Sequence, residues 1–129
     1  LINKNGGDSI GVGCSEFVEF IEKGDTSSKE LANVVKEKAS YIKDKVDTLI
    51  LGCTHFGLIS NLIKEELPNV KLIDSSKTVT YDVFDYLKNH DMLSNIGNTL
   101  IYTTGDANYS AKVCQEIFKE DIPFQNIKL

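Results

Sequence analysis

The sequence predicts an α/β protein with a largely parallel sheet and flanking helices. Short apolar runs that can form strands alternate along the chain with amphipathic stretches of helical length. Strands separated by helices of about 10–15 residues indicate βαβ units, in which neighbouring strands run parallel. Polar residues follow several of the strand candidates directly, and ligands of open α/β sheets bind beyond the carboxyl ends of the strands.

The predicted elements alternate regularly. Strands are expected at residues 10–13, 48–51, 71–73, 100–103 and 124–128, and helices at residues 17–21, 31–42, 58–67, 79–87 and 108–118. Glycines make the first strand the weakest of these predictions, because they have no side chain to pack. The run at 48–51 is continuously apolar, which is typical of a strand covered by helices on both faces.

Several residues predict where the helices begin and end. Gly24 ends the first helix, and Asp25 or Ser27 is expected to cap the second. Pro68 follows the third helix, since proline cannot continue it. Asp74, which precedes two serines, is expected to cap the fourth.

Composition narrows the class of protein. The chain has 129 residues, room for one domain, and a formal net charge of −5 without a basic cluster, which argues against nucleic-acid binding. No apolar run approaches the roughly 20 residues that cross a bilayer, and no signal-peptide pattern opens the chain. Three cysteines without CxxC spacing indicate reduced thiols in a cytoplasmic protein. Since the chain begins at Leu1 in a polar stretch and not at Met, we expect a piece of a longer protein.

Cys53 is the leading candidate for chemistry. It follows the predicted strand at 48–51 and precedes a predicted helix, where free backbone N–H groups and the helix dipole favour a thiolate and suit an anionic ligand. Such a thiol can act as a nucleophile or as a base for proton transfer. The alternative is a small buried side chain at the end of a core strand. Thr54 and His55 favour function, because a core position is rarely followed by two polar residues.

The other candidates are weaker. His55 lies two residues from Cys53 and could carry a proton or support a thiolate. No second Cys/His cluster completes a metal site, so no metal is predicted. On the residues alone, Glu22 is a solvated acid at a helix end. We expect structural roles for Cys14 and His90, a core position for Cys114, and a tight or phosphate-binding turn at Gly105 and Asp106.

Residues 51–56, Leu-Gly-Cys-Thr-His-Phe, resemble the second cysteine motif of glutamate racemase, in the cofactor-independent aspartate/glutamate racemase superfamily. The resemblance covers nearly the whole chain in the family's order. It includes residues 14–24, the strand that ends at residues 74–75, and the Thr-Thr-Gly-Asp turn at residues 103–106. The chain departs from the family at Ser15 and Gly57, where members usually have Pro, and at Ser76, where they usually have Gly.

The resemblance implies half of a two-domain, pseudo-symmetric racemase fold. The family enzyme is about twice this length, and the half that carries its first cysteine has no counterpart here. Cys14 cannot replace that cysteine, because its surroundings match another part of the family. By the resemblance, residues 1–74 belong to the second domain, and residues 75–129 return to pack on the absent first domain.

The resemblance also implies roles for individual residues. Cys53 would exchange the α-proton on one face of glutamate, and Thr54 and His55 would contact the substrate. His55 would assist proton transfer at Cys53, and Glu22 would orient the imidazole. No cofactor is implied, so desolvation and fixed dipoles must stabilise the carbanion. The enzyme would act in the cytoplasm and supply D-glutamate for peptidoglycan. Its protein partners would be the absent N-terminal half and, if the enzyme forms a homodimer, a second copy.

Three alternatives remain open on the sequence. A related aspartate or hydantoin racemase would keep the cysteine but should differ at His55. A thiol hydrolase would form a covalent acyl intermediate at Cys53. A non-catalytic α/β fragment would have an unreactive Cys53.

Overall fold

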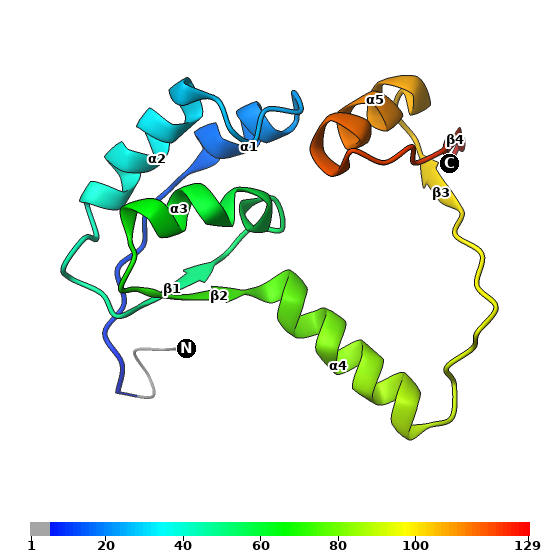
Figure 1. Ribbon diagram of the computed structural model, residues 1–129, viewed down its shortest axis with the longest axis horizontal. Coiled ribbons are helices and arrows are strands. Elements are labelled where there is room, and N and C mark those ends of the chain that lie inside the picture. Colours follow the sequence, from blue (N-terminus) through cyan, green and yellow to red (C-terminus); the bar gives the residue numbers. More distant parts are fainter. Residues whose placement is uncertain (1–5) are drawn as a thin grey trace.

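The computed structural model describes residues 6–129 and shows helices alternating with parallel strand pairs (Figure 1). In chain order, the elements are α1 (Ser15–Ile21), α2 (Lys29–Ser40), β1 (Thr48–Leu51), the 3₁₀ helix η2 (Phe56–Ile59), α3 (Ser60–Glu66), β2 (Lys71–Asp74), α4 (Ser75–Asn89), β3 (Ile101–Thr103), α5 (Ala107–Phe118) and β4 (Phe124–Asn126). The α/β class and the parallel pairing are confirmed. The strands divide between two sheets of two strands each, β1 with β2 and β3 with β4.

The buried core lies beside the first sheet. Strands β1 and β2 pair in parallel with Leu51 opposite Asp74, and α1, α2 and α3 lie on one side of them (Figure 1). The buried side chains are Phe17, Ile21, Leu31, Val35, Ala39, Ile42, Leu51, Ile59, Ile63, Leu67 and Val70. Ile50 points away from this core and is 52% exposed. The expectation that helices cover both faces of residues 48–51 is therefore wrong, because no described helix packs on the second face.

The second sheet forms a separate unit that α4 connects to the first (Figure 1). Strands β3 and β4 pair in parallel with Ile101 opposite Phe124, and α5 packs on them. None of the described residues after Val70 is buried. No helix in residues 6–129 is long and apolar enough to cross a membrane.

The start of α2 differs in detail from the prediction. Gly24 adopts a φ of +84° in the turn after α1, as expected for a glycine that ends a helix. The helix cap is Ser28, whose Oγ accepts a hydrogen bond from the Leu31 amide at 3.1 Å. Asp25 instead accepts hydrogen bonds from the amides of Ser27 and Ser28 at 3.2 and 2.9 Å. The predicted cap at Asp25 or Ser27 is wrong, because the carboxylate forms the turn that leads into the helix.

Two further expectations are corrected. Residues 10–13 form no strand, since no described strand pairs with them and their two glycines offer little to pack. Val12 still packs against the core. The helix expected at residues 58–67 is divided into η2 and α3, and it ends before Leu67 and Pro68. By contrast, Asp74 caps α4 as predicted, through a hydrogen bond from the Ser76 amide to its Oδ1 at 3.0 Å.

The turn at Asp25 predicts a pH-dependent contribution to stability. Burial raises the pKa of the Asp25 carboxyl, but hydrogen bonds from Ser28 and Ser27 outweigh burial and lower that pKa overall. The stabilisation is therefore complete above the pKa of the unfolded chain and is lost as pH falls through the lowered folded pKa. We expect Asp25→Asn to reduce the free energy of unfolding at neutral pH, with a difference from wild type that shrinks at low pH.

Urea unfolding followed by circular dichroism, between about pH 2 and pH 7, checks this expectation. Asp121→Asn is the control, because Asp121 is an exposed acid between α5 and β4. An equal effect of both substitutions at every pH would contradict the assignment.

Candidate functional site

The site lies at the carboxyl end of β1 and contains three of the predicted residues. Cys53 comes two residues after the strand, and its Sγ lies 3.6 Å from Nδ1 of His55. The other ring nitrogen of His55, Nε2, lies 3.7 Å from Oε1 of Glu22. Glu22 is the residue at which α1 ends. The fold therefore aligns a thiol, an imidazole and a carboxylate, in that order.

The three groups are accessible from solvent. The side chains of His55 and Glu22 are 36% and 64% exposed, and Cys53 is half-buried. An ion pair with this exposure is worth at most about 1 kcal/mol to the fold. The arrangement therefore contributes little to stability, and it can orient the imidazole beside a sulfur that a small molecule can reach.

The surroundings of Cys53 differ from the prediction of a helix N-terminus. The segment after it is a four-residue 3₁₀ helix that begins at Phe56, and the seven-residue α3 begins only at Ser60. The Cys53 carbonyl accepts a hydrogen bond from the Phe56 amide at 3.1 Å, which closes a turn. The polar group beside the sulfur is thus the imidazole of His55 and not the end of a long helix dipole.

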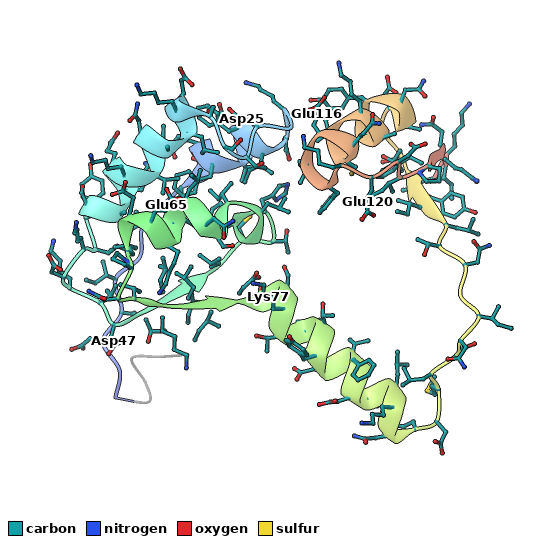
Figure 2. The ribbon with its side chains drawn as sticks, in the orientation of Figure 1. Asp25, Asp47, Glu65, Lys77, Glu116 and Glu120 are labelled. Carbon is teal, nitrogen blue, oxygen red and sulfur yellow. The ribbon has the colours of Figure 1, made fainter. Side chains whose placement is uncertain are left out.

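Thr54 faces a cavity beside this turn. The cavity has a volume of about 460 Å³ and is lined by Thr54, Gly57, Leu58, Asp74, Ser76, Lys77, Thr80 and Tyr81. Figure 2 shows Lys77 at the start of α4, where β2 ends. Because β1 and β2 are parallel neighbours, Cys53 and Asp74 lie at the same edge of the sheet. This edge, at the carboxyl ends of the strands, is where ligands of α/β sheets bind.

The Thr-Thr-Gly-Asp turn at residues 103–106 does not join that edge. It follows β3 in the second sheet, where Asp106 caps α5 by accepting hydrogen bonds from the amides of Asn108 and Tyr109. Although this turn also follows a predicted strand, it does not share the edge with Cys53, because β3 pairs with β4 and not with β1 or β2. Its structural role here is helix capping.

Helix α5 nevertheless borders the site from the other side. A second cavity, of about 390 Å³, lies between α5 and the residues Glu22, His55 and Leu58. The Tyr109 hydroxyl donates a hydrogen bond to the Glu22 carbonyl at 2.9 Å. Tyr109 could not be predicted from the sequence, because it lies 87 positions from Glu22 and no local motif marks such a contact. Cys114 also lines this cavity and is half-buried, so its predicted core position is wrong.

The remaining candidates lie apart from this arrangement. Cys14 directly precedes α1, and its Sγ lies 3.7 Å from the Val12 carbonyl. Burial raises the pKa of the Cys14 thiol, an effect that Lys38 opposes, which leaves Cys14 a poorer nucleophile. His90 stacks on Tyr86 and bonds its carbonyl at the end of α4. Within residues 6–129 no group of three His, Cys, Asp or Glu side chains could hold a metal ion.

Known proteins resemble this chain in both sequence and fold. Glutamate racemase from Thermoanaerobacter sp. (strain X514) is 35% identical over 113 residues, which are 84% of this chain and 43% of that protein. Glutamate racemase from Streptococcus agalactiae serotype V is 31% identical over 125 residues, 93% of this chain and 47% of that protein. No family model matches the chain.

Solved structures show the same relationship. Glutamate racemase from Thermus thermophilus, in complex with beta-chloro-D-alanine, superposes with a TM-score of 0.79 at 24% identity over 90% of this chain and 46% of that one. Glutamate racemase from Francisella tularensis, in complex with D-glutamate, superposes with a TM-score of 0.70 at 28% identity, over 87% of this chain and 44% of that one. This chain belongs to the glutamate racemase family. It spans less than half the length of these relatives.

Gly57 is the departure from the racemase pattern that the structure explains best. A Cβ at this position would lie 2.8 Å from Oδ2 of Asp74 and 3.2 Å from its Cγ, too close for the carboxylate to stay in place. The family usually has proline at this position, and the sequence gives no sign that Asp74 lies beside it. Gly57 therefore makes room for the carboxylate that caps α4.

We expect Gly57→Ala to displace the Asp74 carboxylate and to weaken the cap by about 1 kcal/mol, the usual value of an N-cap. Hydrogen exchange at the Ser76 amide measures the effect directly. Gly52→Ala is the matched control, because a Cβ at Gly52 would meet no atom within 4 Å. Unchanged protection of Ser76 in Gly57→Ala would contradict the steric argument.

Proposed function

We propose that this chain is the part of a glutamate racemase that carries one of the two acid/base groups acting at the α-carbon of glutamate. The observation that carries the proposal is the alignment of Cys53, His55 and Glu22 at the carboxyl end of β1. The relatives described above are all named glutamate racemase, which favours glutamate over aspartate or hydantoins as the substrate.

Each residue has a distinct role in the proposed reaction. The Cys53 thiolate removes or returns the α-proton on one face of the substrate. The neighbouring His55 supports the charge at the sulfur and moves protons to and from it. Glu22 orients the imidazole. Thr54, which faces the cavity beside the turn, contacts the substrate.

The reaction needs a second group from outside this chain. Inversion at carbon requires proton removal on one face and proton delivery on the opposite face. Cys14 is not placed for this purpose, because it precedes α1 and its Sγ contacts the Val12 carbonyl. We infer that the second base lies in the N-terminal half of the enzyme. No cofactor takes part, so the substrate carbanion depends on desolvation and on backbone dipoles.

The division of the chain follows the same proposal. Residues 1–74 belong to the second domain, and residues 75–129 return to the first. The distribution of burial supports this division, because all buried core residues lie between Phe17 and Val70. The second sheet with α4 and α5 contains no buried residue, as expected of an element that packs on a partner. The complete enzyme would act in the cytoplasm, as a monomer or homodimer, and supply D-glutamate for peptidoglycan.

A fusion protein tests this activity. The segment that precedes the matched region in the Thermoanaerobacter relative is joined to this chain, and conversion of L- to D-glutamate is followed by circular dichroism. We expect the fusion to racemise glutamate and Cys53→Ser to lower its rate by about 100- to 10,000-fold, the usual contribution of an acid/base group. Cys14→Ser is the matched control and should keep the activity.

This chain alone should not racemise glutamate, because it lacks the second base. Activity of the isolated chain that Cys53→Ala abolished would refute the two-base assignment. Activity of the fusion that survived Cys53→Ser would instead refute the role of Cys53.

The exposed apolar surface predicts how the isolated chain behaves in solution. Helix α4 extends away from the core (Figure 1), with Val79, Val83 and Phe84 each more than half exposed. Contiguous apolar surface of this kind drives association. Analytical ultracentrifugation should show self-association that decreases when the N-terminal segment of the relative is supplied. A monomer with a single cooperative unfolding transition would contradict the expectation.

A further inference from the structure

Helix α5 contacts the turn after α1 at two places and the buried core at a third. The Tyr109 hydroxyl donates a hydrogen bond to the Glu22 carbonyl. Glu116 packs over Gly24, where an added Cβ would lie 3.0 Å from the Glu116 Cβ. Ile117 packs against the buried core. Figure 2 shows the labelled Glu116 facing the turn that carries Asp25.

Glu22 stands where this attachment meets the candidate site. Its carbonyl, one of the groups that a helix end leaves without an intrahelical partner, accepts the Tyr109 hydrogen bond. Its carboxylate extends in the same region to Nε2 of His55, at 3.7 Å. The Glu22 side chain is 64% exposed, so packing restrains it little. The Glu22 amide is held by a hydrogen bond to the Val18 carbonyl at 2.9 Å, and the Glu22 carbonyl is held by Tyr109.

We propose that Tyr109 is a positioning residue: its hydroxyl fixes the backbone of Glu22 and thereby holds the Glu22 carboxylate beside His55. The inference rests on the proposed function, in which His55 supports the Cys53 thiolate. It adds a specific dependence of the site on α5, a helix of the other sheet. Loss of the hydroxyl alone should weaken the Glu22–His55 contact, leave the imidazole less well oriented beside Sγ of Cys53 and slow reactions of the Cys53 sulfur.

The experiment measures alkylation of the complete chain by iodoacetamide, with the rate at each of the three cysteines followed by peptide mass spectrometry. Tyr109→Phe removes only the hydroxyl. Tyr102→Phe removes the hydroxyl of a half-exposed tyrosine on β3 and is the matched control. Cys114 serves as an internal reporter, because it lies half-buried on α5 and becomes more accessible if that helix detaches.

We expect Tyr109→Phe to slow alkylation of Cys53 by about two- to tenfold, the range that one hydrogen bond supports. Alkylation of Cys114 should stay unchanged, and Tyr102→Phe should have no effect on Cys53. Glu22→Gln should slow alkylation of Cys53 as well. In the double variant that combines Tyr109→Phe with Glu22→Gln, Cys53 should be alkylated no more slowly than in Glu22→Gln alone, because both changes act through one contact.

Two results would overturn the proposal. An unchanged Cys53 rate in Tyr109→Phe would show that the hydroxyl does not position Glu22. Faster alkylation of Cys114 in that variant would show that the hydroxyl merely docks α5.

His55→Ala separates these failures from a failure of the proposed function. If His55→Ala slows alkylation of Cys53 and Tyr109→Phe does not, only the role of Tyr109 is rejected. An unchanged Cys53 rate in His55→Ala rejects the support of the thiolate by His55, and with it both proposals.

Discussion

The parallel pairing of β1 with β2 is the constraint on which the candidate site depends. Their register places Leu51 opposite Asp74, so the turn that carries Cys53 and the start of α4 emerge at the same edge of the sheet. The buried helices on one side hold this pair in place through apolar contact. Because β1 ends at this edge, the thiol of Cys53 is partly exposed, although Leu51 at the end of the strand is buried in the core.

The site is assembled from short polar contacts across distant parts of the chain. Glu22 comes from the end of α1, His55 from the turn after β1, and Tyr109 from α5. Each contact is modest in energy, since the groups are at least partly exposed. In this arrangement Nδ1 of His55 faces the sulfur of Cys53, and Nε2 faces the carboxylate of Glu22.

The sequence predicted most of the elements correctly, for local reasons. The strands at 48–51 and 71–74 are apolar runs bounded by breakers, and Asp74 caps α4 as its position suggested. The predictions that failed depended on a tertiary contact or on which of several neighbouring residues caps a helix. Ser28 was preferred to Asp25 as a cap, and residues 10–13 found no strand partner. The shared sheet edge of Cys53 and Asp74 followed from parallel topology, whereas the turn at 103–106 lies in another sheet.

The sequence by itself determined the class of fold, the candidate cysteine and its polar neighbours in the chain, because apolar periodicity, capping residues and a compact motif are local properties. Only the tertiary structure decided that Glu22 reaches His55, that Gly57 leaves room for the Asp74 carboxylate, and that Tyr109 holds Glu22. These contacts join residues that are 17 to 87 positions apart, and their distances depend on how helices pack on the sheet. No local pattern encodes packing of that kind, since it follows from the sum of many weak apolar contacts.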